Sequence, residues 1–453
     1  MQTLHQLNSG ALQGASKLTI ADNLDEFPRA IFELAPSLEY LDLSGNQLDR
    51  LPHDFGRLHR LKILFLSRNR FTELPAVLAD CPQLEMIGFK SNQIEHIPEN
   101  GLPPALRWLI LTDNRIQALP ESLGRLRFLQ KLMLAGNRLS ALPQSLQQCT
   151  RLQLIRLSAN QLPHLPDFLL SLPQLAWLAF AGNPFCSSTS AVSDASPHVR
   201  MEDLDLLETL GEGASGVIYR ARWRQAPATI KNPEESVAVK RFKGEVTSDG
   251  YARDEMLASL SAGKHPNLVE VLAAVAEEDE ITGLVMRLIP DGFGNLGLPP
   301  SFSSCTRDTF AAGTCFPLQH ILDMAHGVAD AVSHLHARGL CHGDLYAHNV
   351  LCNAERHVLC GDFGAAARFD GLPAHQQAAV QRIELRAFGH FLDDLSGLCT
   401  DAQQEPVRWG ALRHLHESCV AERAESQLSM EDVKQALNAL ANMALNEWQS
   451  GAL

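Results

Sequence analysis

Several features that would assign a sequence to a specialised class are missing from this chain of 453 residues. Its ten cysteines lack CxxC pairs and regular spacing, which argues against a disulfide framework and a zinc site and favours a reducing compartment. No window approaches the roughly 18 uninterrupted apolar residues that span a bilayer. The first residues also lack the basic and apolar regions of a secretory signal. We therefore expect a cytoplasmic protein without a membrane span.

Basic patches are lacking as well. The chain has 52 acidic residues against 38 lysines and arginines, a formal net charge of −14. Because phosphate backbones repel such a chain, nucleic acid is not expected among its partners. Hydrophobic residues make up 45% and charged residues 20% of the sequence, an ordinary globular balance, and the length predicts two domains.

A strict repeat fills the first part of the chain. Within each unit a frame of leucines returns around an asparagine, as in Leu38, Leu41, Leu43, Asn46 and Leu48. The steps between asparagines are 23 residues, with a single step of 22, and their positions are 46, 69, 92, 114, 137, 160 and 183. This is the leucine-rich-repeat pattern, and it predicts an α/β leucine-rich-repeat solenoid over residues 1–186.

The residue types of the repeat have physical reasons. In each LxL segment, a short strand, the leucines are expected to point inward and the residues between them toward a concave face. The asparagine side chain can bind backbone groups left unpaired at the tight corner, and the closing Leu-Pro pair opens the convex connection. Large apolar residues expected at or near the concave face favour a protein partner or substrate there. They are Phe65, Phe89, Trp108, Trp177 and Phe180.

A small, polar stretch at residues 187–200 is interpreted as a linker, followed by a second domain over residues 201–453. That domain opens with Gly211, Gly213, Gly216 and Val217 in the spacing GxGxxGxV. Glycine lets backbone lie against phosphates, but the spacing alone is weak because dinucleotide-binding folds use nearly the same one.

An alternating VAVK segment follows and ends in Lys240, which can clamp nucleotide phosphates. A helical stretch after it supplies Glu255 as the expected partner of the Lys240 ammonium, with Asp254 as the rival. Two further segments, CHGDLYAHNVL and LCGDFGAA, contain Asp344, Asn349 and Asp362.

In this order the glycine loop, VAVK, HxDxxxxN and DFG resemble the eukaryotic-type protein kinase family, serine/threonine-like. The resemblance implies a bilobal α+β kinase fold that uses ATP and Mg²⁺. It implies that Asp344 accepts or orients the proton of the attacking hydroxyl, that Lys240 neutralises phosphate charge, and that Asn349 and Asp362 bind the metal. The adenine contacts that it suggests are Val217, Ala238, Met286 and Ile289.

The chain departs from the family at several places. Residue 343 is glycine where most members carry arginine, and residues 363–395 contain no Ser, Thr or Tyr. We therefore expect no switch by phosphorylation of the activation loop. No APE triplet follows DFG, which predicts a reduced C-terminal lobe, with Glu384 in place of the usual aspartate of the central helix. The insertion 291–317 is expected to form a flap of unknown purpose.

The preferred hypothesis is an active protein kinase that transfers the ATP γ-phosphate to a Ser/Thr hydroxyl, with the repeats recruiting a partner or substrate. Two alternatives stay open. One is a pseudokinase scaffold that binds nucleotide and partners without catalysis, and the other is a kinase of small molecules, favoured by the missing peptide-docking region.

Overall fold

The computed structural model describes residues 2–186, 197–213, 215–227, 230, 236–243, 247, 249–277, 280–421 and 428–443. Most of the expected linker, residues 187–196, lies outside these ranges. The chain divides into two compact units: a first unit of Met1–Leu175 and Gly182–Ser187, and a second unit of Ala176–Ala181 and Ser188–Leu453. The hexapeptide 176–181 therefore belongs to the second unit although it carries the repeat sequence.

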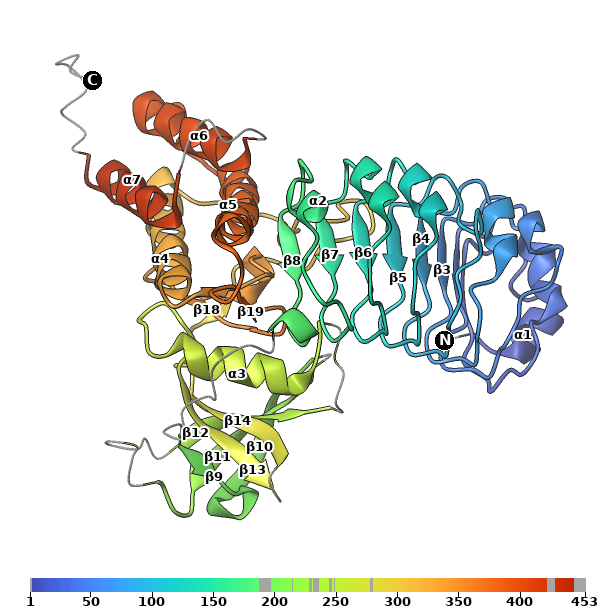
Figure 1. Ribbon diagram of the computed structural model, residues 1–453, viewed down its shortest axis with the longest axis horizontal. Helices are drawn as coiled ribbons and strands as arrows, with labels where there is room; N and C mark the ends of the chain where they lie inside the picture. Colours follow the sequence, from blue (N-terminus) through green and yellow to red (C-terminus); the bar gives the residue numbers. More distant parts are fainter. Residues whose placement is uncertain are drawn as a thin grey trace. The chain divides into compact units, whose positions relative to one another are not determined.

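One short strand comes from each repeat, and the strands form an eight-stranded sheet in chain order (Figure 1). They are β1 (Lys17–Thr19), β2 (Tyr40–Asp42), β3 (Ile63–Phe65), β4 (Met86–Gly88), β5 (Trp108–Ile110), β6 (Lys131–Met133), β7 (Leu154–Arg156) and β8 (Trp177–Ala179). The pairs from β1 to β7 are parallel. Central residues such as Leu41 and Leu64 are fully buried, as the LxL pattern predicts.

The burial of the large aromatic residues corrects part of the expected concave surface. Phe89 and Phe180 are 0% exposed and Trp177 is 1% exposed, so the prediction that these three are available on that face is wrong. Phe89 and Phe180 occupy the inward position that leucine holds in other repeats, such as Leu43. Phe65 is half-buried on β3 and keeps accessible surface.

The asparagines form the predicted ladder. Oδ1 of Asn69 accepts the N–H of Leu48 at 2.9 Å, in the preceding repeat, and Nδ2 donates to the carbonyls of Leu43 and Leu66 at 3.0 and 3.1 Å. Because each amide satisfies buried backbone groups of two repeats, the ladder fixes the stacking distance between them.

Prolines open the connections on the other side of the repeats. Their fixed φ and missing N–H suit the position before a helix, where no donor is needed. Pro28, Pro75, Pro120, Pro143 and Pro166 directly precede η1 (Arg29–Leu34), η3 (Ala76–Asp80), η4 (Glu121–Arg125), η5 (Gln144–Gln148) and α2 (Asp167–Leu170). The remaining short helices of the first unit are α1 (Leu4–Asn8), η2 (Phe55–Arg57) and η6 (Pro184–Cys186).

The second unit begins with a six-stranded sheet in the order β10-β11-β12-β14-β13-β9. The strands are β9 (His198–Val199), β10 (Leu204–Glu212), β11 (Gly216–Trp223), β12 (Ser236–Phe242), β13 (Val271–Glu277) and β14 (Glu280–Arg287), with α3 (Ala252–Ala262) beside them (Figure 1). On β12, Val237 and Val239 belong to the hydrophobic core of the sheet. Since side chains alternate along a strand, Ala238 and Lys240 share the opposite face.

The rest of the second unit is mainly helical. Its helices are α4 (Leu318–Ala337), α5 (Ala374–Ser396), α6 (Pro406–Val420) and α7 (Met430–Asn442). Two small antiparallel sheets combine β15 (Gly294–Asn295), β17 (Val350–Cys352) and β18 (Val358–Cys360), and β16 (Leu340–Cys341) with β19 (Ala367–Arg368). Within the described ranges, no helix combines the length and the apolar character needed to cross a membrane.

Candidate active site

The glycine-rich turn joins β10 to β11. The N–H of Gly213 donates to the carbonyl of Gly216 at 2.9 Å and closes the turn. Among the described residues, a Cβ on Gly211 or Gly213 would meet no atom within 4 Å, whereas a Cβ on Gly216 would collide with the carbonyl of Arg241 on β12. Gly216 is therefore required by the sheet, and the other two glycines present backbone to open space, where phosphates can approach.

Lys240 and Glu255 form an ion pair between β12 and α3. Both are buried, with exposures of 9% and 3%. Burial raises the pKa of Glu255, and the Lys240 ammonium opposes this change. Asp254 lies beside the pair in sequence but does not bind Lys240, and burial raises the pKa of Asp254 to about 6. Among the described residues Oε2 of Glu255 is buried and has no hydrogen-bond partner.

Asp344 and Asn349 lie together on the segment His342–Asn349, which we call loop 342–349. Nδ2 of Asn349 donates to the backbone carbonyl of Asp344 at 3.0 Å and to its Oδ2 at 2.9 Å. The carbonyl of Asn349 accepts the N–H of Gly361 at 3.3 Å, and Nε2 of His342 lies 2.9 Å from the carbonyl of Gly361. These contacts tie the loop to the residue that directly precedes Asp362.

Asp362 is exposed and adopts a left-handed backbone conformation with φ of +57°. Such a conformation is unfavourable for a residue with a Cβ and is concentrated at functional sites. The negative charge of Asp362 contributes to the raised pKa of Glu255, after the larger effect of burial, so Asp362 lies close to the Lys240–Glu255 pair. The structure thus brings together the five polar residues that the motifs single out.

Asp249 also lies at this site, and the motifs did not point to it. A Cβ built on Gly364 would stand 3.7 Å from Oδ2 of Asp249, and the charge of Asp249 also raises the pKa of Glu255. Asp249 falls in a stretch without a recognisable pattern, so no signal in the sequence marks it.

The four expected adenine contacts lie in or next to the six-stranded sheet. Ala238 on β12 pairs directly with Met286 on β14. Val217 pairs with Arg241, and Ile289 follows the end of β14; both are half-buried. The structure therefore places Ala238 beside Met286, while Val217 lies one strand away on β11.

Glu384 of α5 holds loop 342–349 in place through hydrogen bonds to its backbone. Its Oε1 accepts the backbone N–H groups of His342 at 2.6 Å and Gly343 at 2.8 Å, and its Oε2 lies 2.6 Å from Nε2 of His336. Burial acts to raise the pKa of Glu384, but the hydrogen bond from His336, the nearby imidazoles and the Gly343 amide lower it below its ordinary value. The carboxylate is thus held ionised where the loop needs an acceptor.

The insertion 291–317 packs against the same loop. Oδ2 of Asp308 accepts the N–H groups of Ala347 at 2.5 Å and His348 at 3.3 Å, and Oδ1 lies 2.7 Å from Nδ1 of His348. Arg307 binds Asp393 and Asp394 of α5 at 2.8 and 2.5 Å. The insertion therefore connects loop 342–349 to α5, a role that its composition did not indicate.

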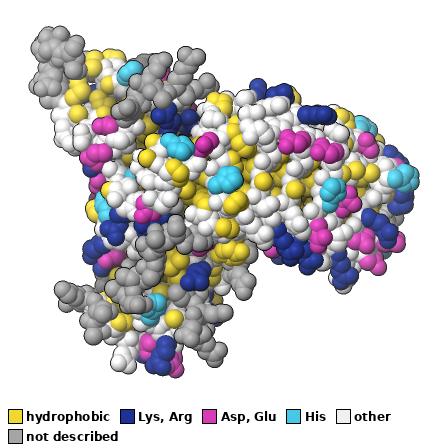
Figure 2. Space-filling view, viewed as in Figure 1, with side chains coloured by type: hydrophobic (Ala, Val, Ile, Leu, Met, Phe, Trp, Pro, Cys, Tyr) yellow, Lys and Arg dark blue, Asp and Glu magenta, His cyan; other side chains and the backbone are white. Residues whose placement is uncertain are grey.

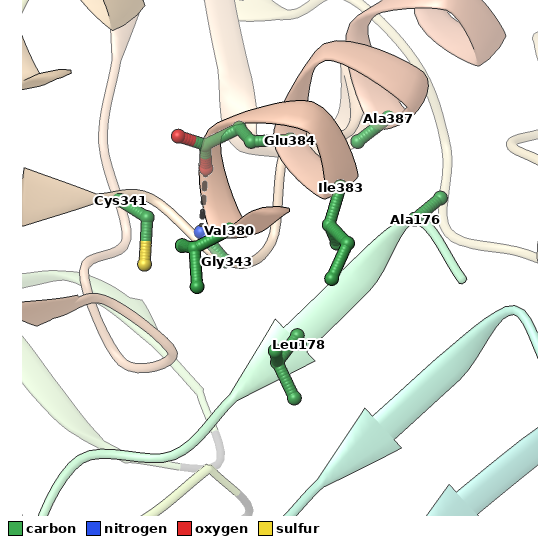
Figure 3. Close-up of a pocket in the computed structure, with 8 residues that line it drawn as sticks. All are labelled: Ala176, Leu178, Cys341, Gly343, Val380, Ile383, Glu384 and Ala387. Carbon is green, nitrogen blue, oxygen red and sulfur yellow. Dashed lines mark hydrogen bonds between the residues drawn. The ribbon is translucent and has the colours of Figure 1, made fainter. Parts of the chain in front are cut away.

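A small pocket in the second unit lies where loop 342–349, α5 and β8 meet (Figure 3). It is lined by Ala176, Leu178, Cys341, Gly343, Val380, Ile383, Glu384 and Ala387. Figure 3 shows the Glu384 carboxylate turned toward the amide of Gly343, with Leu178 on the other side of the pocket. The pocket is a small gap where the loop, α5 and the β8 segment pack together.

Comparison with known families gives a family match for each of the two parts of the chain. Residues 204–386 match the family described as protein tyrosine and serine/threonine kinase. The second unit contains a protein-kinase domain. Residues 14–71, 36–94 and 104–162 match the leucine-rich repeat, so a repeat region precedes the kinase domain.

Similar proteins include the serine/threonine-protein kinase PkaA of Streptomyces coelicolor, 36% identical over 175 residues, which are 36% of this chain and 30% of that protein. Interleukin-1 receptor-associated kinase 1 of Mus musculus is 30% identical over 209 residues, 44% of this chain and 25% of that protein. The chain thus spans between a quarter and a third of the length of these two relatives. A solved leucine-rich-repeat protein of Leptospira interrogans is 26% identical with a TM-score of 0.33, covering 38% of this chain and 50% of that chain.

Proposed function

We propose that this chain is an active, ATP-dependent protein kinase that transfers the γ-phosphate to a Ser/Thr hydroxyl of a protein. The convergence of Lys240, Glu255, Asp344, Asn349 and Asp362 carries the proposal. Mutational drift usually replaces at least one of these residues in a protein that does not depend on them for catalysis. The names of several similar proteins, which are serine/threonine-protein kinases, support the choice of acceptor.

In this proposal Asp344 accepts or orients the proton of the acceptor hydroxyl. The hydrogen bond from Asn349 holds the Asp344 carboxylate in one orientation, which a positioned base requires. Lys240, itself held by Glu255, neutralises charge on the phosphates as it is redistributed during transfer. Catalysis then consists mainly of positioning and charge stabilisation by side chains that are already in place.

The residues present fit a magnesium ion. Nδ2 of Asn349 is used by Asp344, which leaves its amide oxygen for a cation, and the exposed Asp362 supplies a carboxylate. Carboxylate and amide oxygens suit a hard, hydrated cation such as Mg²⁺. When bound there, the ion would neutralise charge on the phosphate oxygens of the substrate.

ATP is the proposed phosphate donor at the same site. The open backbone at Gly211 and Gly213 favours phosphates at the β10–β11 turn, because no Cβ stands in the way. We assign the adenine to the neighbouring strands, against Ala238 and Met286, with Val217 and Ile289 as further contacts.

The repeats are proposed to recruit a protein partner or substrate on their concave face. Phe65 and Trp108 are half-buried on strands β3 and β5 and supply apolar surface there. Figure 2 shows hydrophobic side chains among the strands of the repeats and charged side chains of both signs toward their N-terminal end. We propose that the protein acts in the cytoplasm, where ATP is available and where its ten free cysteines stay reduced.

The test is phosphate transfer by the purified full-length chain, with γ-labelled ATP, Mg²⁺ and casein as a generic acceptor. Asp344→Ala and Asp362→Asn are compared with Asp323→Asn, an exposed aspartate on α4 that serves as the matched control. We expect transfer by the wild type and the control and its loss in both site variants. ATP binding by the wild type without transfer to any protein acceptor would instead favour the pseudokinase scaffold.

A further inference from the structure

The hexapeptide 176–181 carries the strand β8 of the last repeat, yet it is part of the second unit. Within that unit, Ala176 and Leu178 line the pocket shared with Gly343 and with Ile383 and Glu384 of α5 (Figure 3). The sequence pattern assigns this hexapeptide to the repeats. It nevertheless packs against the loop that contains Asp344.

Trp177 makes the most specific contacts of this segment. Its side chain is 1% exposed, and its indole Nε1 donates to the backbone carbonyl of Leu345 at 3.0 Å. The ring stacks on Tyr346 with centroids 4.5 Å apart and planes at 4°, and it also stacks with His390 of α5 at 5.3 Å and 19°. A buried indole with a satisfied N–H and two stacked neighbours has one orientation available.

The stack continues along loop 342–349. The rings of Tyr346 and His348 lie 4.9 Å apart with their planes tilted by 33°, and Asp308 binds Nδ1 of His348 at 2.7 Å. Four rings, those of His390, Trp177, Tyr346 and His348, therefore run from α5 to the residue before Asn349; we call them the aromatic stack. Burial lowers the pKa of His390 to about 3, so this ring stays neutral and the stack carries no charge at its α5 end near neutral pH.

Gly343 explains how the segment comes so close to the loop. It has φ of +73°, and a Cβ there would lie 2.5 Å from the carbonyl oxygen of Ala365 and 2.9 Å from that of Leu178. Any larger residue at 343 would collide with both carbonyls, so the loop, the Ala365 segment or the hexapeptide 176–181 would have to shift. The glycine that replaces the usual arginine of the family is thus matched to the presence of this segment.

We propose that Trp177 is a positioning residue for phosphate transfer. It holds the carbonyl of Leu345 and the ring of Tyr346, the two residues that directly follow Asp344, and so fixes where the Asp344 carboxylate stands. The inference rests on the proposed kinase function. It implies that the catalytic unit includes residues 176–181 and that a residue of the repeat sequence controls the rate of the chemical step.

The experiment compares three variants of the full-length chain with the wild type. Trp177→Leu removes both the ring and its N–H, and Trp177→Phe keeps a ring that can stack on Tyr346 but loses the donor. Trp409→Leu, at a half-buried position on α6, is the matched control for the loss of an indole. The kcat, the KM for ATP, the equilibrium Kd for Mg²⁺-ATP and the Tm are measured for each, and kcat is corrected for the folded fraction.

A misplaced catalytic group lowers the rate without changing ground-state binding. We therefore expect Trp177→Leu to lower kcat roughly 10- to 100-fold while KM and Kd for ATP change less than about twofold. Trp177→Phe should recover a large part of the lost kcat, because the stack is restored. The control should keep the kcat of the wild type even if its Tm falls.

The outcomes separate this inference from the proposed function. An inactive wild type would remove the kinase proposal and this inference with it. An active wild type beside a Trp177→Leu variant with unchanged kcat would overturn the inference alone. If Trp177→Leu does not fold, Tyr346→Leu tests the same stack from the loop side, and an unchanged kcat in that variant would overturn it equally.

Discussion

Replacement of Glu384 is a demanding test of how loop 342–349 is held. The Glu384 carboxylate is fully buried and accepts two backbone N–H groups of the loop, with His336 on its second oxygen. Glu384→Ala leaves both amides without an acceptor inside the protein. Glu384→Gln keeps one neutral acceptor oxygen of the same shape but loses the negative charge.

The expected magnitudes follow from these contacts. A buried donor without a partner costs about 1–3 kcal/mol, and Glu384→Ala leaves two such backbone donors on the loop. We therefore expect Glu384→Ala to lower the free energy of unfolding by about 3–5 kcal/mol. Since Glu384→Gln still accepts from the loop, its loss should be about 1–2 kcal/mol.

The pH dependence has a definite sign. The pKa of Glu384 in the folded protein lies below its ordinary value of 4.5, so the ionised carboxylate stabilises the fold at pH above that value. This contribution is lost as pH falls through the lowered folded pKa. The difference in stability between the wild type and Glu384→Gln should consequently be largest near pH 7 and shrink below pH 4.5.

The assay is urea unfolding of the full-length chain, followed by tryptophan fluorescence and circular dichroism at pH 7 and in acid, with kcat measured in parallel. Asp323→Asn, on the surface of α4, controls for the loss of a carboxylate. An unfolding free energy of Glu384→Ala within about 1 kcal/mol of the wild type would refute this account of the loop.

Three further changes probe other parts of the molecule. Asn137→Ala removes one accepted and two donated hydrogen bonds of the ladder, so the repeats should lose about 2–4 kcal/mol in urea unfolding; an unchanged midpoint would contradict the ladder. Asp254→Asn should stabilise the protein by roughly 1–3 kcal/mol at pH 7, because the pKa of Asp254 is raised to about 6 and its buried charge is unfavourable above that pH. The gain should fade in the same assay as pH falls through 6 toward 4, and a constant gain would contradict it. Asp308→Asn should lower kcat about tenfold in steady-state assays with an unchanged KM for ATP, since the insertion loses its charged hold on the loop; a change in KM alone would argue against this role.

The sequence predicted the repeats well because their period is a local, recurring signal. Each Asn ladder contact joins residues about one repeat apart, so the pattern of one unit predicts the contacts of all. The error concerned Phe89, Phe180 and Trp177, and for the first two the repeat frame itself contained the answer. The position of Phe89 and Phe180 in the frame is the inward one, where burial of a large apolar residue outweighs exposure.

Most residues of the candidate site could also be predicted from the sequence, because they stand in motifs with fixed order and spacing. The choice between Glu255 and Asp254 needed the structure, since neighbouring residues on a helix point about 100° apart and only one faces Lys240. Asp308 and Trp177 could not be predicted. The Trp177 contact spans 168 residues and depends on packing that no motif encodes.

The role of Lys240 is tested by the initial rate of labelled phosphate transfer by Lys240→Met. Lys264→Met, at an exposed lysine just after α3, is the control. We expect Lys240→Met to lose roughly 100-fold or more of the rate while its circular dichroism spectrum stays that of the wild type. A fully active Lys240→Met variant would contradict this role, because transfer would then proceed without the lysine that Glu255 holds at the site.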